Sequence, residues 1–328
     1  MNPSQDHLPS PVNTSGDPDE LEEWSALQGW ELEYLPCEPR SFEAQFRDLE
    51  LPGTVLQHER WSSSLQLLGT IRGDVVPIAI PLDSRGVFQG LPFNSGDLIF
   101  MKPGSDLNLL AQSPVELLTL HVPKHDLESV GVKLGIENPM DLLSGPPVVD
   151  LSPSFRQNWL KGMFEFFQIP AGFTSARKEL ESQMLCLFWE SLTNQNTRKS
   201  GLAVNPPAVI RYIKRAQKFI EENLTDTICL EDIAAVSGVS ARMLQLCFRE
   251  YFQMSPMQYL RWRRLHLVRK ALQEESPHFV TVTRVAMTYG FFHLSRFSGE
   301  YKHMFGELPN QTLHLKRSRG FISVPAIT

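Results

Sequence analysis

The sequence predicts an α+β N-terminal domain, made of a small β-barrel or sandwich followed by a pair of helices, and an all-α C-terminal domain. Short alternating apolar runs lie between Pro and Gly breaks from residue 30 to about residue 123. Apolar residues recur at helical spacing from residue 153 onward. The C-terminal third also contains an internal duplication with an offset of 53 residues. With 328 residues, the chain is long enough for two domains of roughly 100 to 200 residues each.

The N-terminal domain is expected over residues 23–197, after a disordered tail over residues 1–22 that is rich in Pro, Ser, Asn and Asp. Apolar runs at residues 75–80, 98–101 and 117–120 predict its strands. The residues that predict the helical pair are Trp159, Met163, Phe166 and Phe167, followed by Leu180, Met184, Leu187 and Phe188. Residues 198–206 are expected to form a linker, and residues 317–328 a C-terminal tail.

The duplication is the most specific feature of residues 207–316, the expected C-terminal domain. Residues 248–256 and 301–309 share the order aromatic, base, two residues, Phe, three residues, Pro. Upstream, Ala234 precedes Gly238 by four residues, and Ala286 precedes Gly290 by four. Glycine ends a helix in the left-handed conformation, and alanine lets a second helix cross closely. Each copy therefore predicts a helix-turn-helix, with recognition helices over about residues 240–252 and 293–305.

A single helix is expected between the two copies, from Ser255 or Pro256 to about Gln273. Roughly 18 residues at 1.5 Å each give a length of about 27 Å. A stiff helix of that length can place two recognition helices in successive major-groove segments, about 34 Å apart on one face of a duplex.

These motifs together resemble the DNA-binding domain of AraC/XylS transcription regulators over about residues 207–315. The resemblance rests on segments 230–234, 238–240, 244–249, 255–265, 285–291 and 296–309. It implies a sequence-specific regulator, not an enzyme, that binds a double-stranded DNA operator and contacts RNA polymerase, with no cofactor. The residues leave activation and repression both open.

The contact candidates on the first recognition helix are Arg242, Gln245, Leu246 and Arg249, because Leu244 and Phe248 lie four residues apart and must be core. By the resemblance, the first three face bases and Arg249 faces the backbone. Arginine can donate twice to guanine, and glutamine can pair with adenine. An ordinary solvated charge is the alternative for Arg242.

The second recognition helix offers His293, Leu294, Ser295, Arg296 and Ser298, since Phe297 and Tyr301 are expected in the core. Gly299 stands where the family usually has a polar contact residue, so this unit is expected to bind more weakly or less selectively. On the connecting helix, phosphate contact and a plain solvated face are equal alternatives. The basic residues concerned are Arg261, Arg263, Arg264, Arg269 and Lys270.

Charge separates the two parts of the chain. Residues 207–328 hold 17 Lys and Arg against 10 Asp and Glu, whereas residues 1–206 hold 14 against 27. A basic domain suits a polyanion, because neutralised phosphates release condensed counterions.

The N-terminal domain resembles the cupin-like sensor and dimerisation domain of AraC-type regulators. The resemblance implies a small-molecule effector and a homodimer that forms through the helical pair, whose apolar stripe would otherwise cap the barrel. Candidates for an effector pocket are His58, Trp61, Phe88, Phe93 and Phe100, each with a plain core position as the alternative. The spacing of His58, His121 and His125 does not fit a cupin metal site.

Several classes of protein are excluded or disfavoured. The sequence has no run of about 18 apolar residues and no apolar N-terminal leader, so we expect a cytoplasmic protein. Four scattered cysteines argue against a zinc site or a disulfide framework. An enzyme lacks support because no nucleophile elbow or phosphate loop is seen. An architectural protein with inactive helix-turn-helix units remains a second alternative, and it would bind DNA without sequence preference.

Overall fold

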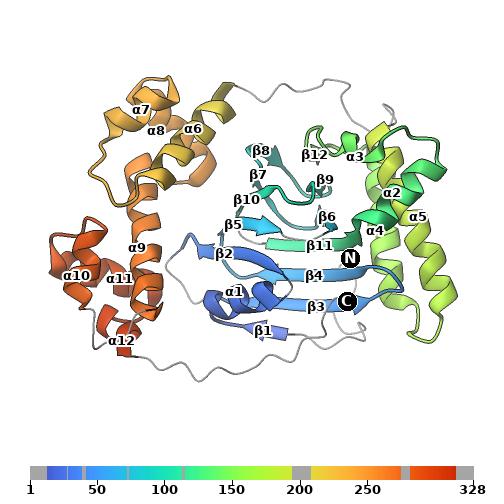
Figure 1. Ribbon diagram of the computed structural model, residues 1–328, viewed down its shortest axis with the longest axis horizontal. Coiled ribbons are helices and arrows are strands. Elements are labelled where there is room, and N and C mark those ends of the chain that lie inside the picture. The colour runs from blue at the N-terminus through green and yellow to red at the C-terminus, as the bar shows by residue number, and fades with distance from the viewer. Residues whose placement is uncertain are drawn as a thin grey trace. The chain divides into compact units, whose positions relative to one another are not determined.

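The computed structural model describes residues 13–27, 29–38, 42–71, 74–112, 115–193, 208–274 and 281–314 (Figure 1). They form two compact units, one from residues 13–34 and 42–193 and the other from residues 208–314 with segment 35–38. The expected linker and C-terminal tail lie outside these ranges. No helix within these ranges has the length and apolar character needed to cross a membrane.

The N-terminal unit contains two sheets, so its barrel is an open one. The seven-stranded sheet has the order β1 (Asn13–Ser15), β3 (Ala44–Glu50), β4 (Val55–Trp61), β11 (Val115–Pro123), β6 (Val75–Pro81), β9 (Leu98–Phe100) and β12 (Val148–Val149). The five-stranded sheet has the order β2 (Trp30–Pro36), β5 (Leu65–Ile71), β10 (Asp106–Gln112), β7 (Arg85–Phe88) and β8 (Leu91–Phe93). The strand-rich fold predicted for this half is confirmed.

The seven-stranded sheet separates two hydrophobic cores, because side chains alternate between the faces of a strand. On one face, Leu56, Ile80 and Leu118 pack with the helices α2 (Lys124–Lys133), α4 (Pro153–Gln168) and α5 (Thr174–Thr193), near the short helix α3 (Pro139–Leu142). On the other face, Trp61 and Leu117 pack with residues of the five-stranded sheet. The unit is thus layered as helices, sheet and sheet.

The helical pair is confirmed, and its apolar stripe caps the sheet. Trp159 and Trp189 are fully buried, and both satisfy their indole nitrogens inside the core. Trp159 Nε1 donates to Ser191 Oγ at 3.0 Å, and Trp189 Nε1 donates to the Leu127 carbonyl at 2.9 Å. Of the two uses left open for this stripe, the structure contains the capping one.

The structure differs from the expected disordered tail over residues 13–22. Strand β1 pairs with β3, and the helix α1 (Pro18–Leu27) buries Leu21 and Trp24. The Trp24 ring lies 5.4 Å from that of Phe46. Two apolar residues three positions apart are too few for a compositional signal, but they suffice when a sheet supplies their partners. Residues 1–12 lie outside the described part of the chain.

The C-terminal unit is all-α, as predicted. The helix α9 (Pro256–Glu274) runs between two groups of helices (Figure 1). The first group is α6 (Ala208–Glu222), α7 (Leu230–Ser237) and α8 (Ala241–Phe252), and the second is α10 (Val282–Thr288), α11 (Leu294–Phe305) and α12 (Pro309–His314). The predicted single connecting helix is confirmed, and 19 residues give it a length of about 28 Å.

A continuous row of aromatic rings joins the two groups through α9. From Phe252, ring centroids follow at 4.9 Å to Tyr259, 5.4 Å to Trp262, 5.0 Å to His266 and 5.1 Å to Phe305. The row continues along α11 through Tyr301 at 4.7 Å and Phe297 at 5.7 Å. Offset and edge-to-face aromatic pairs stabilise packing beyond the area that they bury. Both copies of the duplication are therefore parts of one packed body.

Candidate nucleic-acid interface and ligand cavity

The first recognition helix, α8, follows a turn that the sequence specifies locally. Gly238 ends α7 with φ 76°, in the left-handed region that favours glycine. Ser240 then caps α8, because its Oγ accepts a hydrogen bond from the Met243 amide at 3.2 Å. Leu244 and Phe248 are fully buried, as their spacing predicts. The helix is thereby fixed in rotation about its own axis.

That rotation turns most of the candidate contacts outward. Arg242, Leu246 and Arg249 are exposed, and Gln245 is half-buried beside them. Met243, which the sequence reasoning did not include, is also exposed at the N-terminal end of α8. An apolar residue is not an obvious contact candidate, since helical spacing alone does not distinguish an exposed Met from a core one.

The second recognition helix, α11, repeats this geometry with differences. Gly290 has φ 79°, and Phe297 and Tyr301 are buried. His293, Ser295 and Arg296 are exposed. Gly299 is exposed too, so the helix presents no side chain there.

Two candidates on α11 lie elsewhere than expected. Leu294 is half-buried and packs against the core of the second group. The Ser298 hydroxyl donates to the Leu294 carbonyl at 2.9 Å, one turn earlier. Both side chains are therefore engaged within the second group of helices in this structure. The turn before α11 instead exposes Phe292, whose side chain is 68 % accessible.

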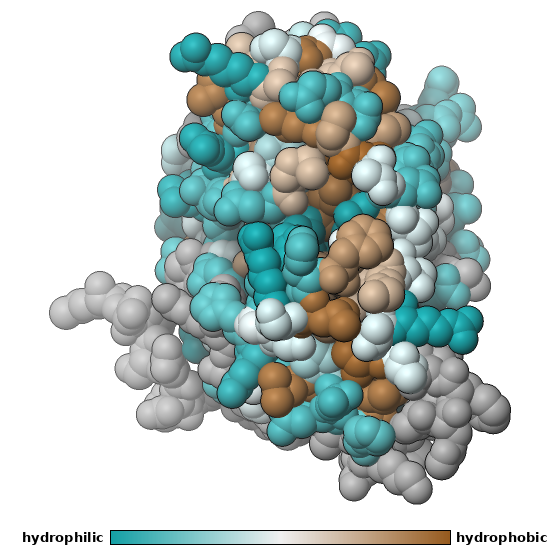
Figure 2. Space-filling model, turned by 90° about the vertical axis from the view of Figure 1, so that its left-hand side faces the viewer, coloured by the Kyte–Doolittle hydropathy of each residue, from teal (hydrophilic) through white to brown (hydrophobic). Residues whose placement is uncertain are grey.

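Apolar side chains reach the surface of the C-terminal unit among hydrophilic ones (Figure 2). The large exposed ones are Val236, Met243, Leu246, Met257, Met287, Phe292 and Leu308. Base edges offer thymine methyl groups as well as hydrogen-bonding atoms. Of these residues, Met243 and Leu246 lie on α8 and Phe292 lies in the turn before α11, so exposed apolar side chains accompany the polar candidates of both recognition helices.

The basic residues of α9 are mostly engaged inside the protein. Arg263 is 4 % exposed and binds Glu221 through two nitrogens, at 2.7 and 2.8 Å. Arg264 donates to the Leu224 carbonyl at 2.8 Å, and Arg269 lies over the Phe305 ring at 5.1 Å. A solvated face does not describe these three residues. Their charges hold the neighbouring helices against α9, and buried ion pairs of this kind are costly to break.

Glu300 connects the second recognition helix to α9. Arg296 Nε donates to Glu300 Oε1 at 2.8 Å, and Arg261 Nε donates to Glu300 Oε2. Partial burial opposes ionisation of Glu300, but the hydrogen bonds from Arg261 and Arg296 outweigh it and lower the pKa of the carboxyl. One carboxylate thus pairs with two arginines on the face expected to meet DNA and offsets part of their positive charge.

Replacing Glu300 with glutamine should tighten non-specific DNA binding, because both arginines are released to phosphates. Each additional phosphate contact steepens the slope of log K against log salt by about 0.9. We expect one or two additional phosphate contacts in Glu300→Gln. Salt titration of binding to a duplex of random sequence measures the slope that reports them. Glu250→Gln removes the same charge from α8. No described hydrogen bond or ion pair joins the Glu250 carboxylate to an arginine, so this change should leave the slope nearly unchanged. Equal slopes for all three proteins would show that Glu300 does not restrain the arginines.

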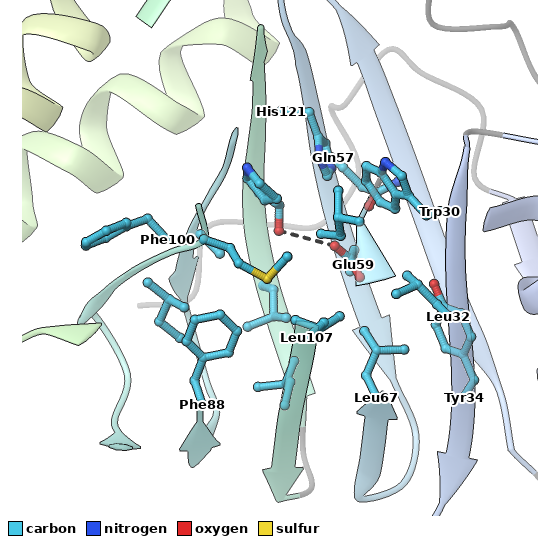
Figure 3. Close-up of a pocket in the computed structure, with 18 of the residues that line it drawn as sticks. Trp30, Leu32, Tyr34, Gln57, Glu59, Leu67, Phe88, Phe100, Leu107 and His121 are labelled. Carbon is cyan, nitrogen blue, oxygen red and sulfur yellow. Dashed lines mark hydrogen bonds between the residues drawn. The ribbon is translucent and has the colours of Figure 1, made fainter. Parts of the chain in front are cut away.

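The N-terminal unit contains a cavity of about 90 Å³ between its two sheets (Figure 3). Gln57, Glu59 and His121 lie together with Trp30, whereas Phe88 and Leu107 lie toward the other end. Gln57, Glu59 and His121 come from β4 and β11 of the seven-stranded sheet. Trp30, Phe88 and Leu107 come from the five-stranded sheet. The cavity wall is therefore largely apolar, with polar side chains that come mainly from β4 and β11.

The pocket candidates divide between the cavity and its surroundings. Trp61, Phe88 and Phe100 line it. Phe93 is buried in the core beside it. His58 lies on the opposite face of β4, because Gln57, Glu59 and Trp61 occupy the alternate positions that face the cavity. There it binds Glu116 Oε1 at 2.8 Å, and this hydrogen bond, outweighing burial, lowers the pKa of Glu116.

Comparison with known proteins places the likeness mainly in the C-terminal unit. Residues 233–314 match the family model described as a helix-turn-helix domain. The chain is 37 % identical over 130 residues to the XylDLEGF operon transcriptional activator 2 of Pseudomonas putida, covering 40 % of this chain and 80 % of that relative. It is 38 % identical over 106 residues to activator 1 of the same operon, but spans only 32 % of that relative's length. A longer match is less similar: the chain is 27 % identical over 205 residues to the probable thc operon regulatory protein of Rhodococcus erythropolis, covering 61 % of each chain.

Two solved structures are also similar. A probable AraC family transcriptional regulator from Rhodopseudomonas palustris is 32 % identical, with 31 % of this chain and 94 % of that one covered and a TM-score of 0.30. The AraC-like transcriptional activator CuxR is 16 % identical, with 79 % of this chain and 94 % of that one covered and a TM-score of 0.43. The relatives named here are transcriptional regulators rather than enzymes.

Proposed function

This chain belongs to the AraC/XylS family of transcriptional regulators, and we propose that it activates transcription from an operator that its two recognition helices contact in successive major-groove segments. The observation that carries this proposal is the single helix α9, which joins the two helix-turn-helix units into one packed body. A length of about 28 Å approaches the spacing of about 34 Å between groove segments on one face of a duplex.

The proposed base contacts come from the exposed N-terminal parts of α8 and α11. On α8 they are Arg242, Gln245 and Leu246, with Arg249 toward the phosphates. On α11 Arg296 is the strongest candidate, beside His293 and Ser295, and Leu294 and Ser298 contribute only if they leave their present contacts. Because Gly299 presents no side chain, α11 is expected to discriminate less than α8.

Gln245→Ala and Arg296→Ala should each relax base preference in one half-site by about 1 to 3 kcal/mol, which is roughly 5- to 150-fold in affinity ratio. Each variant serves as the control for the other, because its effect should be confined to its own half-site. The measurement is footprinting on the operator and on duplexes altered in one half-site. Neutral results for both variants, or binding that depends on salt but not on sequence, would contradict the proposal.

The N-terminal unit is proposed to bind a small-molecule effector in the cavity between its sheets. Binding would shift the balance between two arrangements of the protein that differ in operator affinity. We further propose that the chain acts as a homodimer through the outer faces of α4 and α5, and that the DNA-bound protein contacts RNA polymerase. Sedimentation of the full chain with and without operator tests the dimer, and a monomer at every concentration would contradict it.

A further inference from the structure

We propose that the cavity of the N-terminal unit takes a small organic amine, and that Glu59 is the residue that selects a positively charged ligand. This inference rests on the proposed function, since it names the chemical class of the effector. It depends on three features of the cavity: an isolated carboxyl group, an excess of hydrogen-bond acceptors and walls made of aromatic rings.

The carboxyl group of Glu59 has no cationic partner among the residues described. It is 9 % exposed and accepts one hydrogen bond, from Thr119 Oγ1 at 3.2 Å. No lysine or arginine is found among the cavity-lining residues of the described chain. A buried carboxylate without a partner is strongly disfavoured, and a ligand that brings a positive charge removes that penalty.

The neighbouring polar groups add further acceptors. Gln57 Nε2 donates to Asp48 Oδ1 at 2.9 Å, which leaves the amide oxygen of Gln57 as an acceptor. His121 is 6 % exposed, and neither of its ring nitrogens has a hydrogen-bond partner in the described structure. A neutral imidazole offers one acceptor and one donor. An ammonium group has three donors and no acceptor, so it complements this set, whereas a carboxylate would face the carboxyl group of Glu59.

Aromatic rings also form much of the cavity wall. The Trp30 ring lies 4.9 Å from the His121 ring, and Trp61 and Tyr34 also line the space. Ring faces attract cations, most strongly when the site excludes water. An engineered cavity of about 150 Å³ holds benzene, so the smaller volume of about 90 Å³ suits an amine with fewer heavy atoms than benzene, about four or five.

Amine binding should release a proton. Burial raises the pKa of Glu59 to about 8, with Thr119 lowering it and Asp48 adding to it, so at pH 7 the carboxyl is mostly protonated in the free protein. An ammonium group would stabilise the ionised carboxylate and expel that proton. The other titratable groups facing the site keep their state at pH 7, because burial lowers the pKa of His121 to about 4 and raises that of Tyr34. Burial raises the pKa of Asp48, but this residue accepts a hydrogen bond from Gln57 and is not among the described residues that line the cavity.

Titration calorimetry on the full chain at pH 7 tests this with three ligands of matched shape: isobutylamine, isobutanol and isobutyrate. Isobutylamine should bind at least ten-fold more tightly than isobutanol, and isobutyrate should not bind. Titrations in two buffers of different ionisation enthalpy count the protons that the protein releases on binding. Binding of the amine should release up to one proton at pH 7, and this number should fall toward zero at pH 9. Equal or tighter binding of the alcohol or the carboxylate, or no binding by any of the three, would overturn the proposal.

Glu59→Gln keeps the shape and the Thr119 contact but cannot ionise. It should lose both the advantage of the amine over the alcohol and the proton release, while isobutanol binding persists. Glu116→Gln is the matched control, because that carboxyl belongs to neighbouring β11 but binds His58 on the face away from the cavity. Retained selectivity in Glu59→Gln, or its loss in Glu116→Gln alone, would contradict the role of Glu59.

Operator binding separates this inference from the proposed function. If the protein footprints its operator but binds none of the amines, the ligand class is wrong and DNA-binding regulation stands. If isobutylamine binds with Glu59-dependent selectivity but leaves operator affinity unchanged, the ligand class stands and control by an effector in this cavity is wrong.

Discussion

Phe297→Ala is expected to lower the free energy of unfolding of the C-terminal unit by about 3 to 5 kcal/mol, because a buried aromatic side chain is replaced by a cavity. Phe297 is fully buried, with ring centroids 5.0 Å from Phe291 and 5.7 Å from Tyr301. It thus anchors α11 to the aromatic row that continues onto α9. Chemical denaturation of the full chain, followed by far-UV circular dichroism, measures the change. Operator footprints should lose the half-site assigned to α11 before that of α8.

The matched control lies five residues away. Phe292→Ala removes the same side chain from a position that is 68 % exposed. Its effect on unfolding should stay within about 0.5 kcal/mol, as for surface substitutions in general. Similar destabilisation by the two changes would mean that α11 does not pack on Phe297 as the structure has it.

Glu59→Gln should stabilise the N-terminal unit at high pH and have no such effect at low pH. The folded protein holds the pKa of Glu59 at about 8 against an ordinary value of 4.5, chiefly through burial. Below pH 4.5 the carboxyl is protonated in both folded and unfolded chains, so it imposes no penalty. As pH rises from 4.5 to 8, the wild type should lose about 1.4 kcal/mol per pH unit, up to roughly 5 kcal/mol.

His121 produces the opposite trend at lower pH in both proteins. Burial lowers its pKa from 6.5 to about 4. The folding stability that depends on a neutral His121 is therefore fully present above pH 6.5 and is lost as pH falls toward 4. The difference between Glu59→Gln and wild type therefore isolates Glu59. Urea unfolding at pH 5 and pH 9 measures that difference, which should be several-fold larger at pH 9. A difference independent of pH would show that Glu59 ionises freely in the folded protein.

Much of the C-terminal unit followed from local sequence signals. Gly238 and Gly290 adopt the left-handed conformation that the repeated spacing predicted, with φ 76° and 79°. Leu244, Phe248 and Phe297 are buried as helical periodicity requires. These features depend on backbone conformation and on the period of the α-helix, which neighbouring residues largely determine. The same holds for the single helix between the two copies.

Other assignments needed partners that are distant in the sequence. Arg263 reads as a surface charge on α9 until Glu221 is found beside it, 42 residues earlier. Leu21 and Trp24 are buried because a sheet strand lies against α1. Similarly, His58 was a pocket candidate, whereas the register of β4 turns it away from the cavity and turns Glu59 into it.

The sequence by itself determined that the chain contains two helix-turn-helix units joined by one helix, because glycine conformation and helical period are encoded within a few consecutive residues. Only the tertiary structure decided which charges are neutralised and which line a cavity. The cost of burying a charge depends on the groups around it, and for Glu59, Arg263 and Glu300 those groups come from other strands and helices.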